Sequence, residues 1–372
     1  MSQTNAAAWI TASGANPLQV KEAPYPTVGA KELVIKNHAV AINPVDYMLQ
    51  DFGNLIFKWI KYPAIFGSDL AGEVMEVGSE VSDFKKGDRV LAMAVGCDPD
   101  CNDSAAGAFQ NCTVVRADLT SKIPSSLDYV HASVLPLCLS TAASGLFQKD
   151  YLGLQLPSEP AKPPTGETLI IWGGSTSVGS NAIQLAVAAG YEVISTASPK
   201  NFEYVEKLGA TQVFDYNSKS VVQDMISSLK DKTVAGAVAI GTGSLHACVD
   251  ILSASKGSKF ITDISGPGAP KGPPTGLNLV RMMGTMIYHN VSIWTKSRLA
   301  GVSSKFVWGS DLKKNEVGPA IFAEFLPKAL ESGSYIIAPD PEVVGHGLDQ
   351  IQNAFDILRK GVSAKKLVVT LQ

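Results

Sequence analysis

A glycine-rich segment at residues 173–179 carries the clearest signal for chemistry in this sequence. It follows an apolar stretch at 168–172, an expected strand, and precedes an expected helix at 178–189. Glycines let the backbone approach a pyrophosphate, and the first N–H groups of the next helix can bind that anion. The spacing is not a strict G-x-G-x-x-G, and a tight turn without a ligand is the alternative. We predict a dinucleotide site formed by Gly173, Gly174, Ser175, Thr176, Ser177, Val178 and Gly179.

The residues about twenty positions after the glycine-rich segment indicate whether NAD or NADP is bound. NAD-binding proteins of this kind place an Asp or Glu there, which hydrogen-bonds the ribose 2′-hydroxyl. This sequence has residues 195–200, STASPK, without an acid to repel a 2′-phosphate. The hydroxyl of Ser198 and the ammonium of Lys200 could receive that phosphate. The segment therefore predicts NADPH as the cofactor, with a solvated Lys200 of no consequence as the alternative.

Composition and charge exclude several other classes of protein. The 372 residues are 45% hydrophobic and 17% charged, and the net charge is −3, so a nucleic-acid partner is not expected. Five cysteines and five histidines form no disulfide or ligand pattern. No apolar stretch reaches the ~18 uninterrupted residues of a membrane span, and no signal peptide is recognised. We expect a cytoplasmic protein that acts on a small molecule.

Two architectures are expected along the chain. The first ~130 residues contain short β-rich runs separated by Gly and Pro, and residues 126–147 have helical character. From residue 168, strands and helices alternate, which is typical of a doubly wound parallel sheet. The last elements can return to the first domain. We therefore predict an α/β fold with a β-rich domain at 1–150 and 310–372 and a Rossmann domain at 151–309.

Several motifs resemble those of the medium-chain dehydrogenase/reductases. Residues 41–46 (AINPVD), 66–74 (FGSDLAGEV) and 87–90 (GDRV) look like the N-terminal half of that superfamily. Residues 173–179 and 207–210 (KLGA) look like its cofactor half. The resemblance covers nearly the whole chain and implies a GroES-like substrate domain plus a Rossmann domain, with the active site in the cleft.

Within the superfamily, the sequence is most similar to the zinc-free quinone oxidoreductase and enoyl reductase branch. The proline-rich loop before residue 168 and residues 195–201, 213–216 and 365–369 are similar to fungal trans-acting enoyl reductases of polyketide pathways. This similarity implies a role in secondary metabolism. It leaves a homodimer and an association with a partner synthase as alternatives.

The resemblance also shows which metal ligands are absent. Zinc-dependent members carry Cys at the position of Asn43 and His at that of Ser68, and a third ligand would fall near Leu137. An amide and a hydroxyl cannot replace a thiolate and an imidazole, so no catalytic zinc is expected. The family's four-cysteine structural zinc lobe is not expected either, because Cys97, Cys101 and Cys112 differ from it in number and spacing.

Other candidate residues follow from the same resemblance. Thr141 occupies the place where relatives approach the nicotinamide, with a helix N-terminal hydroxyl as its alternative role. Tyr216 looks like a tyrosine packed near the adenosine phosphate, or else a half-buried strand aromatic. Asn43 and Asp46 are expected to brace the substrate cleft. Tyr47 is a candidate proton donor, although core packing is an alternative and some relatives instead carry Lys where this chain has Met48.

The methionines and aromatics between residues 282 and 294 could line an apolar pocket or belong to the core. They are Met282, Met283, Met286, Tyr288 and Trp294.

Without a Lewis acid to polarise a carbonyl, hydride transfer to an electron-poor carbon is the favoured reaction. We therefore expect an NADPH-dependent oxidoreductase that reduces an apolar α,β-unsaturated carbonyl compound or a quinone without zinc. A zinc-free carbonyl reductase or alcohol dehydrogenase is the first alternative. A non-catalytic NADPH-binding protein is the second.

Overall fold

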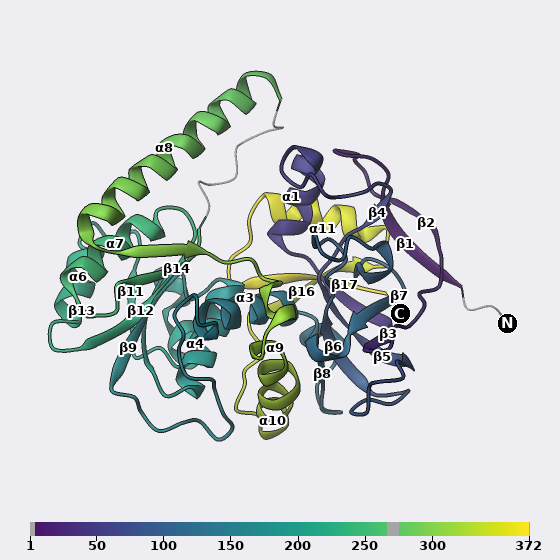
Figure 1. Cartoon of the computed structure of the whole chain (residues 1–372), viewed down its shortest axis with the longest axis horizontal. Helices are drawn as coiled ribbons and strands as arrows, with labels where there is room; N and C mark the ends of the chain where they lie inside the picture. The colour runs from purple at the N-terminus through teal and green to yellow at the C-terminus, as the bar shows by residue number, and fades with distance from the viewer. Residues whose placement is uncertain (1–3, 266–274, 372) are drawn as a thin grey trace. The chain divides into compact units, whose positions relative to one another are not determined.

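The chain forms two compact units, shown by the computed structural model, which describes residues 4–265 and 275–371 (Figure 1). Unit 1 contains Met1–Ser140 and Gly318–Gln372, and unit 2 contains Thr141–Val317. The first division falls inside helix α3 (Pro136–Phe147), whereas the sequence prediction placed it at residue 150. The proline-rich stretch before residue 166 is a surface loop of unit 2, since Ser158 and Lys162 donate backbone hydrogen bonds to Ala188.

Unit 1 is built on β-sheets. A seven-stranded sheet has the order β16-β17-β3-β5-β6-β8, with β7 beside β3, and a small sheet has the order β2-β1-β4. Strand β17 pairs antiparallel with β3, so the end of the chain returns to the sheet formed by its beginning. The strands are β1 (Asn5–Ile10), β2 (Gln19–Ala23), β3 (Glu32–Ala41), β4 (Ala64–Ile65), β5 (Asp69–Val77), β6 (Arg89–Met93), β7 (Cys112–Arg116), β8 (Thr120–Lys122), β16 (Asp340–His346) and β17 (Lys365–Thr370).

Short helices surround these sheets. Helix α11 packs beside β17 and carries an apolar face on which Ile351, Ala354 and Phe355 are buried. A π-helical turn at Ala320–Phe325 leads into α10. The helices of unit 1 are α1 (Pro44–Phe52), α2 (Tyr129–Ala132), α10 (Leu326–Ser332) and α11 (Gln350–Arg359), and α9 (Val317–Pro319) lies at the division.

Unit 2 contains an all-parallel sheet with the order β11-β10-β9-β12-β14-β15, and β13 pairs with β12. Counted along the chain, this is the 3-2-1-4-5-6 order of a dinucleotide-binding fold, which confirms the predicted α/β class. The strands are β9 (Glu167–Trp172), β10 (Glu192–Ala197), β11 (Gln212–Asp215), β12 (Thr233–Ile240), β13 (Lys256–Gly257), β14 (Phe260–Ile264) and β15 (Ser303–Phe306).

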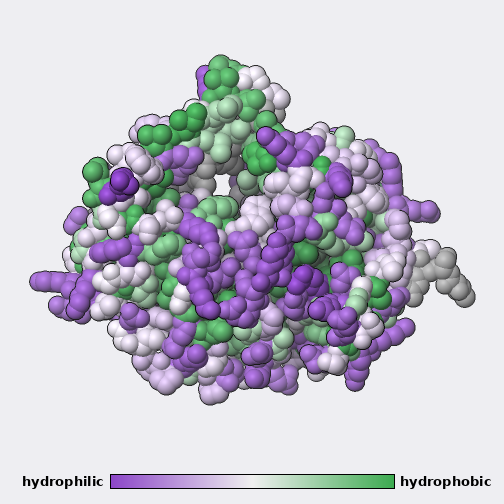
Figure 2. All heavy atoms as spheres, in the orientation of Figure 1, coloured by the Kyte–Doolittle hydropathy of each residue, from purple (hydrophilic) through white to green (hydrophobic). Residues whose placement is uncertain are grey.

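The helices of unit 2 follow the predicted alternation as far as β14. They are α4 (Ser177–Ala188), α5 (Phe202–Lys207), α6 (Val221–Ser228) and α7 (Ser244–Ala254), and a further helix, α8, spans Gly276–Ala300. Residues such as Ile170, Ile194, Met225 and Leu252 form a buried core on the sheet. Helix α8 was not predicted, and in Figure 2 apolar side chains gather along it at the upper edge of the view.

The sequence at 126–147 was expected to be helical, with Pro136 ending or kinking its first helix. In the structure the first helix of this stretch, α2, ends at Ala132, before Pro136. Pro136 begins α3, because proline is tolerated in the first turn, where its missing N–H has no intrahelical acceptor. The stretch Tyr129–Phe147 is long and apolar enough to span a membrane, yet 83% of its most apolar window is buried inside the protein. It serves as a core element.

Candidate functional site

The glycine-rich turn lies between β9 and α4, as predicted. Thr176 is the N-cap of α4, and its hydroxyl oxygen accepts a hydrogen bond of 3.0 Å from the N–H of Gly179. The turn is tied to the neighbouring strand, because the N–H of Gly173 donates to the Thr196 hydroxyl at 3.0 Å. The beginning of α4 is thereby held at the carboxyl edge of the sheet, where such folds bind pyrophosphate.

Each glycine of this turn is required for a different steric reason. Gly173 has φ = +95°, a backbone region that other residues rarely adopt. A Cβ on Gly174 would lie 2.3 Å from the Ser195 hydroxyl, and one on Gly179 would lie 2.2 Å from the carbonyl oxygen of Gly173. The three glycines thus allow a sharp turn and close approach of the helix to it.

The predicted phosphate-binding residues share the same edge. Ala197 of β10 and Asp215 of β11 are paired, so Ser198 and Tyr216 follow them at neighbouring strand ends. Lys200 is exposed in the next turn, and Tyr216 is 46% exposed. The half-buried strand aromatic considered for Tyr216 is therefore not what the structure contains.

An acidic residue at the same edge was not considered from the sequence. Asp215 lies next to the predicted phosphate position, but on β11 rather than β10. Its carboxylate accepts hydrogen bonds from the backbone and side-chain nitrogens of Asn217, at 2.9 and 3.1 Å. This turn engages the Asp215 carboxylate within the loop that follows its own strand. The role of Ser198 and Lys200 toward a 2′-phosphate stays a prediction.

A buried polar centre lies in unit 1 around Asn43. The Lys366 ammonium is hydrogen-bonded to the Asn43 side-chain oxygen and forms an ion pair of 2.9 Å with Asp69. The Asn43 amide nitrogen donates to the same Asp69 oxygen at 2.9 Å. Lys366 and Asn43 are each 4% exposed and Asp69 is fully buried. Burial opposes the charge on Lys366, yet the nearby carboxylates, first Asp69, raise its pKa.

Asp69 extends this centre to helix α3. Its second carboxylate oxygen accepts a 2.6 Å hydrogen bond from the N–H of Leu137, in the first turn of the helix. An anion at this end of a helix is stabilised by the N–H groups that have no intrahelical acceptor. Thr141 follows one turn later and is 8% exposed, so Lys366 and Asp69 fix the start of the helix that carries it.

Asp46 completes the centre from the first turn of α1. One of its carboxylate oxygens accepts a 2.7 Å hydrogen bond from the N–H of Asn43. The other oxygen is buried without a partner among the residues that the structure describes. Burial, reinforced by the charge of Asp69, raises the pKa of Asp46 to about 7. A carboxyl group that titrates near neutrality lies against the buried ion pair.

Tyr47 follows Asp46 on α1 and faces helix α11. The Arg359 guanidinium lies 5.4 Å from the centre of its ring, and that guanidinium is held by two hydrogen bonds to Asp51. Burial and the charge of Asp51 raise the pKa of Tyr47, so the phenol keeps its proton at neutral pH. The ring is half-buried, and its position fits both the predicted donor and partial packing.

The apolar residues of α8 lie outside the core. Met283, Tyr288 and Trp294 are 54, 76 and 64% exposed. Core packing, one of the two roles considered for this set, is therefore not what the structure contains, because Ile293 is the buried side chain of α8. The amphipathic pattern does not distinguish a core-facing stripe from an exposed one.

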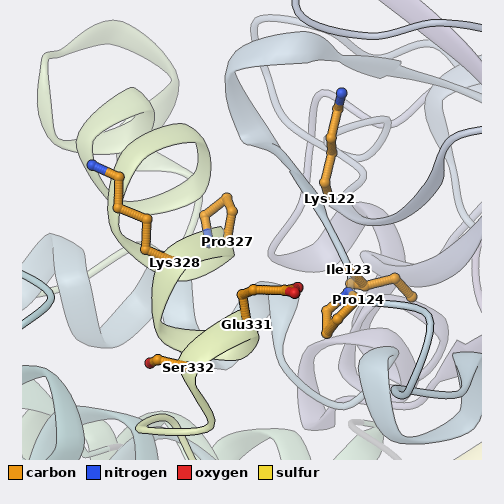
Figure 3. A pocket seen from close by; sticks show the side chains of 7 residues that line it. All are labelled: Lys122, Ile123, Pro124, Pro327, Lys328, Glu331 and Ser332. Carbon is orange, nitrogen blue, oxygen red and sulfur yellow. The ribbon is translucent and has the colours of Figure 1, made fainter.

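An open pocket of about 670 Å³ lies elsewhere in unit 1 (Figure 3). It contains none of the predicted site residues. Its lining residues are Lys122, Ile123, Pro124, Pro327, Lys328, Glu331 and Ser332.

Known proteins match the chain over its whole length. Residues 29–125 match the alcohol dehydrogenase GroES-like domain, and residues 177–294 match the zinc-binding dehydrogenase family. Dehydrogenase pigH of Monascus ruber is 53% identical, covering 99% of this chain and 100% of its own. The trans-enoyl reductase himH of Aspergillus japonicus is 38% identical over 99% of this chain and 97% of its own.

The chain belongs to the medium-chain dehydrogenase/reductase superfamily. Solved structures with the same fold include the CurK enoyl reductase (TM-score 0.74, 19% identity, all of both chains) and the quinone oxidoreductase of Coxiella burnetii (0.68, 21%, all of both chains). A mycobacterial protein solved with NADPH also matches (0.68, 20%, covering 98% of this chain and 99% of its own). The protein is thus an oxidoreductase of this superfamily, and its Rossmann unit suggests a nicotinamide cofactor.

A catalytic zinc does not fit the residues of this medium-chain reductase. Asn43 and Ser68 stand where zinc-dependent members are expected to carry thiolate and imidazole. The Lys366 ammonium contacts the Asn43 oxygen directly. Its positive charge would repel a Zn²⁺ ion placed beside Asn43. Nearby Cys138 donates its thiol to the carbonyls of Val134 and Leu135, and burial raises its pKa to about 12.

The three cysteines considered for a structural zinc belong to no group that could hold a metal ion among the described residues. Cys97 is half-buried, Cys101 is exposed and Cys112 is buried, and all three are free thiols. Within residues 4–265 and 275–371, no group of three or more His, Cys, Asp or Glu side chains could hold a metal ion.

Sequence reasoning missed Lys366 as a member of the site. The residue was noted only as part of a motif at 365–369, and nothing local distinguishes it from the exposed Lys365. In the structure Lys366 follows the exposed Lys365 and directly precedes the buried residues Leu367–Val369 of β17, and a lysine buried there requires a partner.

Proposed function

We propose that this medium-chain reductase reduces an activated C=C bond, in an apolar α,β-unsaturated carbonyl compound or a quinone, with NADPH and without zinc. The observation that carries the proposal is the Lys366 ammonium bound to Asn43 and Asp69. It places a fixed cation beside the residue that replaces a metal ligand. The trans-enoyl reductase relatives support the substrate class.

The cofactor would be held by unit 2. The turn at 173–179 and the N-terminus of α4 suit the pyrophosphate, and Ser198, Lys200 and Tyr216 suit the 2′-phosphate. Bound there, NADPH supplies a hydride for the electron-poor β-carbon. Thr141 would contact the nicotinamide side of the cofactor.

Residues of unit 1 would serve the substrate. Charge develops on the carbonyl oxygen after hydride transfer, and a donor placed in advance stabilises it. Tyr47 keeps its phenolic proton and is our candidate for protonating the α-carbon, with water as the alternative donor. Asn43 and Asp46 hold the start of α1, which carries Tyr47.

The fate of the hydride tests the proposal. With 4-deuterated NADPH and an enone, the label should appear on the β-carbon of the product, and an enone panel should be turned over faster than a ketone panel. Label on the carbonyl carbon would overturn the proposal in favour of a carbonyl reductase. Tight NADPH binding without turnover of either panel would favour a non-catalytic binding protein.

The same relatives suggest a cellular setting. We propose a cytoplasmic enzyme of secondary metabolism, acting either as a homodimer or with a partner synthase. The fungal dehydrogenases and trans-enoyl reductases among its relatives support this setting.

A further inference from the structure

Helix α8 exposes an unusual amount of apolar surface for a helix of 25 residues. Ile293 is its buried residue, and Lys296 ties its C-terminal half to α7 through a 2.7 Å ion pair with Asp250. On the opposite side, Leu277, Val280, Ile287, Val291 and Trp294 are 59 to 65% exposed. A monomeric protein rarely leaves a contiguous apolar face of this size open to water.

The exposed face has the spacing of a helix–helix interface. Its members alternate three and four residues apart, which is the a/d pattern of a coiled coil. We call it the α8 seam, and it consists of Leu277, Val280, Gly284, Ile287, Val291 and Trp294. The pattern continues for almost five helical turns, so a second helix could pack along its length.

We propose that the α8 seam binds the α8 seam of a second copy of this chain, with the two helices antiparallel. A two-fold axis would pass between the helices at the level of residues 285 and 286. Such a contact is isologous, since each copy offers the same surface, and it closes as a dimer.

The order of side-chain sizes along the seam favours the antiparallel direction. In that direction Gly284 meets Ile287 of the second copy, Val280 meets Val291, and Leu277 meets Trp294. Two of these layers then combine a smaller with a larger side chain, and the third combines two valines, so the layers can be filled without a void. The parallel direction would set Gly284 against Gly284, which leaves a void, and Trp294 against Trp294.

The charges on α8 agree with the same direction. The helix carries Arg281, Lys296 and Arg298 and no acidic residue, so a self-contact must keep its cations apart. In the antiparallel pair Arg281 lies at the level of Asn290 of the second copy, with Tyr288 of that copy nearby on the same side. Lys296 is neutralised by Asp250 of its own chain. Arg298 lies beyond the last layer of the overlap.

The area is sufficient for a specific dimer. The seam residues and Tyr288 expose on the order of 700–800 Å² together, close to the ~800 Å² per partner of a standard interface. The aromatic residues Tyr288 and Trp294 are of the type that anchors such interfaces.

The experiment measures the mass of the full chain by sedimentation velocity over a wide range of protein concentration. The unmodified protein should be a dimer. The variant V280E/V291E places like charges in two layers and should raise the dimer dissociation constant by at least ~100-fold. The control Leu299→Glu changes an 85% exposed residue of the same helix outside the seam and should leave the dimer intact.

A second variant tests the direction. In V280K/V291E the introduced lysine meets the introduced glutamate of the other copy only if the helices are antiparallel, so this variant should dimerise at least ~10-fold more tightly than V280E/V291E. Circular dichroism checks that the variants fold. A monomeric unmodified protein, a dimer that survives V280E/V291E, or no recovery in V280K/V291E overturns the proposal. So does a monomer that co-sediments with phosphatidylglycerol vesicles, because a lipid surface would then be the occupant.

Discussion

Lys366 supplies the positive charge of the buried polar centre in unit 1. Removing it in Lys366→Met leaves Asp69 charged and buried without its partner, which costs about 3–5 kcal/mol of unfolding free energy. The adjacent Lys365→Met is the matched control, because Lys365 is exposed and its ion pair with Asp340 lies at the surface, a contact worth about 0–1 kcal/mol. Urea denaturation measures both.

A double variant tests whether the lost stability comes from the unpaired charge of Asp69. In Lys366→Met/Asp69→Asn, no unpaired buried charge remains, so part of the lost stability should return. Equal losses in Lys366→Met and Lys365→Met would contradict the role assigned to the buried pair.

Asp46 predicts a dependence of stability on pH. Its pKa is raised to about 7 in the folded protein, above the ordinary value of 3.8. The stabilisation from its protonated form is therefore complete below about pH 4 and is lost as the pH rises through 7. Asp46→Asn mimics the protonated form, so between pH 5 and 9 the unmodified protein should lose on the order of 2–3 kcal/mol relative to this variant. Parallel stability curves would show that Asp46 does not titrate in this range.

Lys200 tests the choice of cofactor. Lys200→Ala should weaken NADPH binding by ~10- to 100-fold and change NADH binding little, because only NADPH offers the 2′-phosphate. Lys207→Ala is the control, since Lys207 is also exposed but pairs with Glu203 on α5. Isothermal titration measures both affinities. If the unmodified protein binds NADH as tightly as NADPH, the assignment to NADPH is wrong.

At the scale of elements, the junction of β9 and α4 leaves no room for a side chain on Gly174 or Gly179. In Gly179→Ala the new methyl would lie 2.2 Å from the Gly173 carbonyl oxygen, so the helix must move away from the turn. We expect at least a ~10-fold loss of NADPH affinity, because the N–H groups of the helix move with it.

A second helical glycine provides the comparison. Gly284 in α8 has open space around it within its own chain, so Gly284→Ala should leave NADPH affinity unchanged. An unchanged affinity in Gly179→Ala would mean that the turn does not hold the cofactor.

Helix α3 is connected to the buried polar centre through Asp69. The N–H of Leu137 in its first turn donates a hydrogen bond to the Asp69 carboxylate, and Thr141 lies one turn further along. A change at Lys366 can therefore disturb the first turn of α3, which precedes Thr141.

At the scale of the whole molecule, the prediction concerns metal. Activity should survive exhaustive chelation, and elemental analysis of the purified protein should find zinc well below one equivalent per chain, because Lys366 already supplies the positive charge beside Asn43. Stoichiometric zinc whose removal abolishes turnover would contradict the proposed mechanism and the fit derived from the buried centre.

Local signals in the sequence were enough for the fold class and for the position of the glycine-rich turn between β9 and α4. Alternating apolar strands and helices determine a parallel sheet, and residues 173–179 follow the first of these strands directly. Each inference depends on neighbours a few residues apart. That Ser198 and Tyr216 follow the ends of adjacent strands was seen only in the structure, which pairs β10 with β11.

Only the tertiary structure decided the contents of the buried centre and the exposure of α8. Lys366 is 323 residues from Asn43 in the chain, and Asp69 is 68 residues from Leu137. The same lysine would be an ordinary surface residue one position earlier, as Lys365 is. Whether a charge is buried and paired depends on which strands meet across the sheet, and whether an apolar helix face is covered depends on its tertiary neighbours. Neither property is encoded in the local pattern of residues.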